Sequence, residues 1–192
     1  MYLNQDDELE AVNEILGSIG EPPVSTIENT DNLDVVNALR VLRNASKMIQ
    51  SKGWTFNIEQ GLVMTPDYYT KTIAYSSDIL SMRLRNGATP YVNRNGLVYD
   101  RLNRTDIFDG PISVDTIRMR PLSDMPECFY RYIVNTASLK FASNFFGEPT
   151  TLQRLQNEVE QARIDCNEYE LDYGNYNALT GDAYISQQLS RG

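Results

Sequence analysis

The chain of 192 residues contains no histidine and only two cysteines, Cys128 and Cys166. The absence of histidine excludes Ser-His-Asp and Cys-His nucleophilic sites and removes the most common metal ligand. Two isolated cysteines cannot form a zinc site of the usual kind, and they fit a reducing compartment without a disulfide framework. We therefore expect no metal and no cofactor, and we interpret both cysteines as small buried hydrophobic residues.

Long apolar runs are also missing. No segment approaches the roughly 18 apolar residues that a membrane-spanning helix needs, and the first stretch, MYLNQDDELEAV, is acidic, unlike a secretory signal. The net charge is −9, whereas nucleic-acid binders use lysine and arginine to neutralise phosphates. These features predict a soluble protein, assembled in a cytosol, without membrane insertion and without ordinary binding of nucleic acid.

Helical periodicity dominates both ends of the sequence. Apolar residues recur every three or four positions in 6–20, 32–52, 124–146 and 149–169. Asp31 or Asn32 can cap the second helix and Gly53 can close it, after which an extended segment is expected to carry Trp54 and Phe56 into the core. Six residues are predicted to form the structural core: Leu42, Ile49, Trp54, Phe56, Ile133 and Phe141.

The helical spacing of apolar residues is lost between Asn57 and Pro121. Short apolar runs at 62–64, 72–75 and 91–92 are bounded by turn-forming residues, as strands are. Asn95-Gly96 predicts a hairpin with a type I′ turn, in which both central residues need positive φ. A further strand is expected after Asp109-Gly110-Pro111, while 76–86 is compatible with either a strand or a short helix.

The last two helices carry distinctive signals. Asp124 is placed to cap the third helix, with Pro126 in its first turn and Gly147 at its end. In the fourth helix apolar residues follow a heptad-like spacing, which fits either packing within the subunit or a seam against a neighbouring subunit. The polar tail after residue 173 either frays or becomes ordered on a partner, with tyrosines as anchors. The seam residues are Leu152, Leu155, Val159, Ala162, Cys166 and Tyr169.

We therefore predict an α+β protein. A four-helix bundle-like α domain (1–56 and 122–173) would carry a small antiparallel β-rich insertion (57–121) and an extended C-terminal docking arm (174–192). The candidate interface residues with a neighbouring subunit or partner are Leu152, Leu155, Val159, Asn95, Gly96, Tyr173, Tyr176 and Tyr184.

The sequence contains no GxxxxGK[ST], GxGxxG or HExxH motif. The remaining chemistry would need carboxylates, lysine or tyrosine, and a glycosidase needs only two well-placed carboxylates. The acidic pairs are Asp6 with Asp7, Asp106 with Asp109, and Glu168 with Glu170. Arginines concentrate in the β region, interleaved with Tyr91 and Tyr99. This pattern favours salt bridges, either to the adjacent acids or to the acidic face of another subunit, over a nucleic-acid surface. These arginines are Arg83, Arg85, Arg94, Arg101, Arg104, Arg118 and Arg120.

Several uncommon strings occur in a characteristic order: AVNEILGSIGEPPVST, IQSKGWTFNIEQG, YVNRNGLVYDR, DMPECFYRYIV and YELDYGNYN. Through them, over roughly residues 8–185, the chain resembles the tail tubular protein A family, the head-to-tail adaptors or gatekeepers of short-tailed bacteriophages (podoviruses). The resemblance implies a structural virion protein without enzymatic activity. It also implies a helical bundle that carries a β-rich part, as the change of period predicts.

The resemblance further implies the partners. Family members form a homododecameric ring beneath the capsid portal, receive the nozzle protein (tail tubular protein B) on the other side, and lie near the tail fibres. DNA leaves through the central channel without specific binding. Two rival functions remain at this point: a glycan hydrolase of the bacterial envelope that uses a carboxylate pair, and a DNA-binding module that uses the arginine-rich region.

Overall fold

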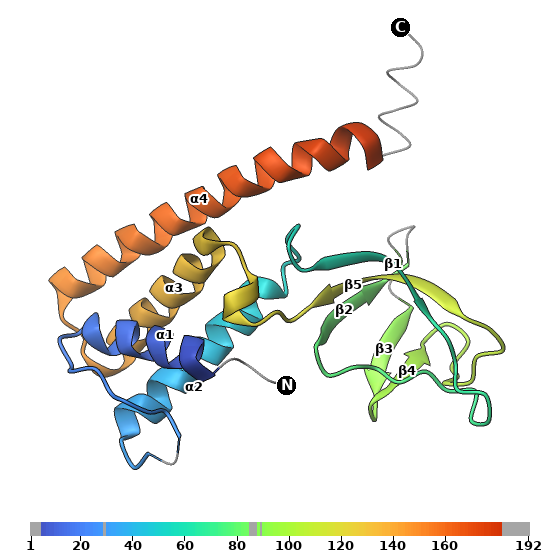
Figure 1. The fold of residues 1–192 in the computed structure, drawn as a ribbon, viewed down its shortest axis with the longest axis horizontal. Coiled ribbons are helices and arrows are strands. Elements are labelled where there is room, and N and C mark those ends of the chain that lie inside the picture. Colours follow the sequence, from blue (N-terminus) through green and yellow to red (C-terminus); the bar gives the residue numbers. More distant parts are fainter. Residues whose placement is uncertain (1–4, 29, 85–87, 89, 182–192) are drawn as a thin grey trace, which may run out of the picture. The chain divides into compact units, whose positions relative to one another are not determined.

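Four helices and two small antiparallel sheets make up the described part of the chain, which confirms the predicted α+β class (Figure 1). The structure is a computed structural model that describes residues 5–28, 30–84, 88 and 90–181. The chain divides into two units: a β unit of residues 50–120, and a helical unit formed by the residues on either side. Among the described residues no helix is both long enough and apolar enough to cross a membrane.

The helical unit begins with α1 (Gln5–Gly17) and α2 (Leu33–Gln50). Asn32 caps α2, because its Oδ1 accepts a hydrogen bond from Asp34 N at 2.9 Å. Glu8 of α1 is buried, and its carboxylate accepts two hydrogen bonds from the Arg43 guanidinium of α2, at 2.9 and 2.8 Å. This bidentate pair fixes α1 against α2.

The second half of the helical unit is an antiparallel pair, α3 (Glu127–Phe145) and α4 (Pro149–Gly181). Gly147 lies between them at a φ of 69° and donates a hydrogen bond to Ala142 O, which closes α3 as the sequence predicts. Glu148 then caps α4. Hydrogen bonds from the Thr150 hydroxyl and from Thr151 lower the pKa of Glu148 to about 2.

The predicted start of α3 is wrong by a few residues. Asp124 ends a short 3-10 helix, η1 (Leu122–Asp124), and makes no side-chain cap for α3. Met125 is extended, with φ −107° and ψ 153°, because the ring of Pro126 disfavours the helical conformation in the residue before it. Helix α3 therefore begins only after Pro126.

The fourth helix is longer than predicted. It continues without interruption to Gly181, so residues 174–181 of the expected extended arm are helical, and residues 182–192 lie outside the described residues. A helix satisfies its backbone hydrogen bonds internally, which an extended segment without a sheet cannot do.

The β unit contains a three-stranded antiparallel sheet in the order β1-β5-β2 and a two-stranded hairpin, β3-β4. The strands are β1 (Ile58–Met64), β2 (Ile79–Arg83), β3 (Tyr91–Arg94), β4 (Leu97–Asp100) and β5 (Ile112–Arg118). Both sheets contribute to one small core, formed by Ile73, Ile79, Met82, Val98, Phe108 and Val114. The segment 76–86, for which the sequence allowed a strand or a short helix, contains the strand β2.

The predicted hairpin is confirmed. Asn95 and Gly96 have φ values of 54° and 79°, as a type I′ turn requires, and Val92 pairs with Tyr99 across it. The strand expected at 72–75 is wrong: Ala74 forms only one isolated bridge, to Leu97. Lys71, at a φ of 57°, turns the chain immediately before this segment and prevents a longer ladder.

The segment after α2 also differs from the expected extended one. Residues 55–57 form a turn directly after Trp54. Both Trp54 and Phe56 are only half-buried. The fully buried side chain is Asn57, which accepts a hydrogen bond from Trp54 N at 2.8 Å and donates to the carbonyls of Gln50 and Arg118 at 3.0 and 2.9 Å. Gly53 permits this reversal because its φ is 79°.

Candidate interaction surfaces

The predicted seam of α4 faces α3 within the same subunit. Leu155, Ala162 and Cys166 are buried, whereas Leu152 and Val159 are half-buried. Cys128 of α3 interacts with Cys166, and burial raises the pKa of both thiols. Leu155 therefore packs within the subunit, which was the first of the two interpretations of the seam.

The seam continues past the point where α3 begins. Tyr169 meets Phe129 of α3 edge to face, with ring centroids 5.7 Å apart. Tyr173, one heptad after the buried Cys166, stacks on Tyr169 at 4.3 Å but is 58% exposed. Leu171 is 63% exposed. Tyr176 belongs to the last turns of α4, whose side chains are not described, and Tyr184 lies outside the described residues.

A groove opens at the other end of the helical unit, and we call it the three-helix groove. Its volume is about 520 Å³. The apolar side chains along it include Val41, Leu139 and Leu152, and Met48 is 55% exposed beside them. Two exposed cations, Arg40 and Lys140, also line it. The groove thus combines an apolar surface with positive charge, and it contains Leu152, one of the candidate interface residues.

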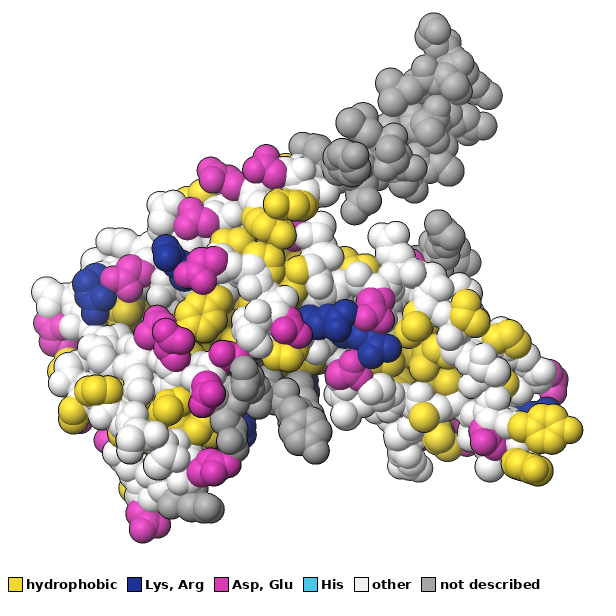
Figure 2. Space-filling view, viewed as in Figure 1, with side chains coloured by type: hydrophobic (Ala, Val, Ile, Leu, Met, Phe, Trp, Pro, Cys, Tyr) yellow, Lys and Arg dark blue, Asp and Glu magenta, His cyan; other side chains and the backbone are white. Residues whose placement is uncertain are grey.

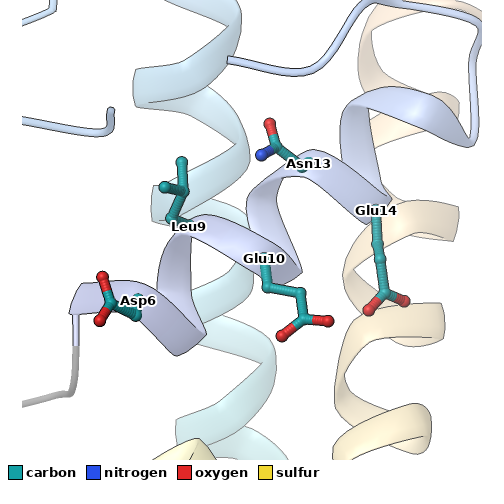
Figure 3. A pocket seen from close by; sticks show the side chains of 5 residues that line it. All are labelled: Asp6, Leu9, Glu10, Asn13 and Glu14. Atoms are coloured by element: carbon teal, nitrogen blue, oxygen red, sulfur yellow. The ribbon is translucent and has the colours of Figure 1, made fainter. Parts of the chain in front are cut away.

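An acidic ridge runs along α1. Asp6, Glu10 and Glu14 follow at intervals of four residues, so they lie on neighbouring turns of one face. Figure 3 shows Glu10 and Glu14 pointing to the same side of α1, away from Leu9 and Asn13. Glu14 accepts a hydrogen bond from the Tyr130 hydroxyl at 2.7 Å, and burial together with this carboxylate raises the pKa of Tyr130. The ridge therefore concentrates negative charge on the surface of the helical unit.

In the β unit the candidate residues Asn95 and Gly96 are both exposed at the tip of the β3-β4 hairpin. The Gly96 carbonyl accepts a hydrogen bond from Tyr75 N at 2.8 Å, and Asn93 Oδ1 accepts one from Gly96 N at 3.0 Å. These bonds hold the turn in one conformation, so it presents a preformed protrusion.

Two further loops of the β unit expose large apolar side chains. Tyr68, Tyr69 and Leu102 are 78%, 89% and 77% exposed. A carboxylate organises each loop: Asp67 accepts from Tyr69 N and Thr70 N, and Asp100 accepts from the backbone after it. These exposed side chains could not be predicted from the sequence, because a turn-forming residue such as Asp67 does not indicate whether the aromatic residues beside it are exposed.

The arginines of the β unit differ in their contacts. Arg118 lies 2.8 Å from Glu59 and 2.7 Å from Asp78, and Arg120 lies 2.6 Å from Glu59, which confirms the expected salt bridges for these two residues. Arg94 lies over the Tyr99 ring, 3.5 Å from its centroid. Arg83, Arg101 and Arg104 are exposed, and Arg85 lies outside the described residues.

Two of the candidate carboxylate pairs lie in different units, one on α4 and one before β5. Glu168 and Glu170 are two residues apart on α4 and therefore point to different faces of the helix. Asp106 and Asp109 lie in the irregular segment before β5, where Asp106 is half-buried and Asp109 exposed. Among the described residues no group of three or more acidic or cysteine side chains is placed to hold a metal ion.

Comparison with known proteins gives consistent results. The family model described as tail tubular protein matches residues 9–176, which include both units. Tail tubular protein A of Klebsiella phage KP34 is 25% identical to this chain over 155 residues, which cover 80% of this chain and 81% of the phage protein.

Proposed function

Because this chain belongs to the tail tubular protein family and is therefore a structural component of a phage tail, we propose that it forms the adaptor ring between the capsid portal and the tail nozzle. The observation that carries this proposal is the family match, which spans residues 9–176 and thus both units. The ring would be a homododecamer, assembled in the host cytoplasm, that also contacts the tail fibres. Its central opening would form part of the channel for DNA ejection.

A subunit of such a ring needs two different surfaces that fit each other, because a cyclic assembly of more than two copies uses heterologous contacts. It needs further surfaces for the portal and for the nozzle. The exposed end of the α4 seam, the three-helix groove, the Asn95-Gly96 turn and the loops with Tyr68 and Leu102 supply distinct candidates. This variety suits an adaptor better than an enzyme with one cleft.

Native mass spectrometry tests the adaptor proposal. The purified protein is measured alone and after mixing with the portal ring of its phage, and we expect twelve copies to join one portal ring. A free dodecamer that caps the portal would support the same function with assembly encoded in the subunit contacts. A protein that stays monomeric beside a well-formed portal ring would contradict the proposal, and a sugar-release assay for glycan hydrolysis would then follow.

The segment 174–192 is proposed to dock on the portal. Its first part, up to Gly181, extends α4, so the helix would direct the remaining residues towards the partner. Deletion of 174–192 should weaken portal binding while the thermal unfolding of the protein stays as before. Undiminished binding by the truncated protein would rule out this arm as the portal contact.

The negative charge is proposed to keep the channel from binding DNA. Twelve copies with a net charge of −9 each would carry about −108 in total, and Figure 2 shows acidic side chains spread over the visible face of the helical unit. The acidic ridge of α1 is our candidate for the channel lining. The double variant Asp6→Asn/Glu10→Gln should slow genome ejection, because phosphates would be repelled less; unchanged ejection kinetics would contradict this role.

A further inference from the structure

The α4 seam and the three-helix groove lie at opposite ends of the same helical unit. Leu152 and Gln156 of the groove belong to the first turns of α4, next to the loop that joins it to α3. Tyr173 lies 21 residues after Leu152, which corresponds to about 30 Å along a helix that rises 1.5 Å per residue. A straight helix cannot fold back over that distance, so the exposed end of the seam cannot fill the groove of its own chain.

Among the described residues, the end of the seam is less covered than the part that faces α3. Cys166 is buried and Tyr169 packs against Phe129, near the first residue of α3. One turn later Tyr173 remains 58% exposed although it continues the same face. Figure 1 shows α4 running on beyond the start of α3. An apolar side chain left exposed on such a helix face is stabilised when a partner covers that face.

The groove has the complementary composition. Its side chains Val41, Leu139 and Leu152 offer an apolar surface to the ring of Tyr173. Its charge is positive, from Arg40 and Lys140, whereas the end of α4 carries exposed Glu168 and Asp172. Opposite charges at the edge of an apolar contact favour one partner and one register.

We propose that the exposed end of the α4 seam, at Tyr173, docks into the three-helix groove of a neighbouring copy of this chain. The contact joins two different surfaces at opposite ends of the subunit, so each added copy offers a new free groove and a new free helix end. Such heterologous contacts produce a closed ring when the rotation between copies permits it. The inference rests on the proposed ring and specifies its subunit contact, while the residues after 173 remain assigned to the portal.

Photo-crosslinking identifies the occupant of the groove. A photoreactive phenylalanine analogue replaces Tyr173, and an equimolar mixture of isotopically labelled and unlabelled chains is irradiated alone at high concentration and with the portal ring. We expect cross-links between chains to peptides that contain Met48, Lys140 or Leu152. Cross-links to portal peptides, cross-links elsewhere on the neighbour, or a lack of cross-links between chains in both samples would overturn the inference.

Charge exchange tests the same contact without a probe. Lys140→Glu and Asp172→Lys should each raise the protein concentration needed for half-maximal ring formation about tenfold, since each places like charges together. The double variant should recover most of this loss. The matched control is Arg83→Glu, which makes the same charge change on an exposed residue of β2 in the β unit and should leave assembly unchanged. Circular dichroism verifies that every variant is folded.

The outcomes separate this inference from the proposed function. Chains that cross-link through the groove but ignore the portal would support the subunit contact and contradict the adaptor role. Rings that form on the portal with Lys140→Glu and Asp172→Lys as readily as with the wild type would keep the adaptor role and overturn the contact. A double variant that assembles no better than either single variant would also overturn it.

Discussion

Among the described residues, ten of the twelve largest fully buried side chains belong to the helical unit, and the two in the β unit are Gln50 and Val98. Gln50 is an amide. Its side chain exchanges two hydrogen bonds with the backbone of Arg120, at 3.1 and 2.7 Å, and so joins the two ends of the β unit. The helical unit thus depends on apolar burial, whereas the β unit adds a buried network of amides to a small apolar core.

This contrast shows two ways to fill an interior. Apolar burial contributes roughly in proportion to the area removed from water and needs no particular partner atom. A buried amide contributes only when its donors and acceptors are all satisfied, and it therefore fixes one backbone arrangement. The single tryptophan, Trp54, lies in the β unit, so its fluorescence reports on that unit while circular dichroism reports mainly on the helices.

The largest loss of stability is expected from a substitution in the core of the helical unit. Phe129→Ala removes a fully buried ring that contacts Tyr169 and should lower the free energy of unfolding by about 3–5 kcal/mol. The loss should be visible in urea unfolding followed by circular dichroism. Phe146→Ala is the matched control, because Phe146 is 52% exposed and should cost less than about 1 kcal/mol. Equal effects of the two variants would refute the assignment of Phe129 to the core.

The second effect tests the amide network. Asn57→Ala removes the hydrogen-bond partner of three backbone groups, Trp54 N, Gln50 O and Arg118 O. It should destabilise the β unit by about 2–3 kcal/mol, because buried groups without partners are costly. The Trp54 fluorescence transition should shift to lower urea concentration more than the helical signal does. Gln60→Ala, at an exposed amide of β1 in the same unit, is the control; a shift as large as that of Asn57→Ala would contradict this account.

The contrast between the units also explains what the sequence could predict. Helical periodicity predicted four helices, and Asn95-Gly96 predicted the β3-β4 hairpin, because both signals are local. The buried roles of Gln50 and Asn57 were missed, since a glutamine at a helix end and an asparagine in a turn look like surface residues until the strand that they bond is in place. The groove was missed for the same reason: Arg40, Lys140 and Leu152 come from three helices, and no local pattern joins them.

A smaller effect concerns the turn after α2. Gly53 has a φ of 79°, and a Cβ there would lie 2.7 Å from Ile117 Cδ1. Gly53→Ala should therefore cost about 1–2 kcal/mol for the left-handed conformation, plus the displacement of Ile117. Gly96 has the same φ of 79° with no atom within 4 Å of such a Cβ, so Gly96→Ala measures the conformational cost alone. If the two variants lose equal stability, the close approach to Ile117 adds nothing to the cost of Gly53→Ala.

The smallest effect should depend on pH. Burial by itself would raise the pKa of Asp78, but hydrogen bonds from the Ser76 hydroxyl and the Arg118 guanidinium outweigh it, and the pKa lies below its ordinary value. A carboxyl group whose pKa is lower in the folded state stabilises the fold above its unfolded pKa of about 3.9 and loses that contribution as the pH falls through the folded value.

Asp78→Asn should therefore destabilise the β unit at pH 7 by less than about 1 kcal/mol, because the ion pair is partly exposed to solvent. The difference between wild type and variant, measured by urea unfolding and Trp54 fluorescence, should shrink as the pH is lowered below about 4. Arg118 also contacts Glu59, so Asp78→Asn leaves the guanidinium with one carboxylate and the sheet intact. A difference that stays constant down to pH 3 would show that Asp78 acts through its shape and its neutral hydrogen bonds, and that the β unit gains nothing from this charge.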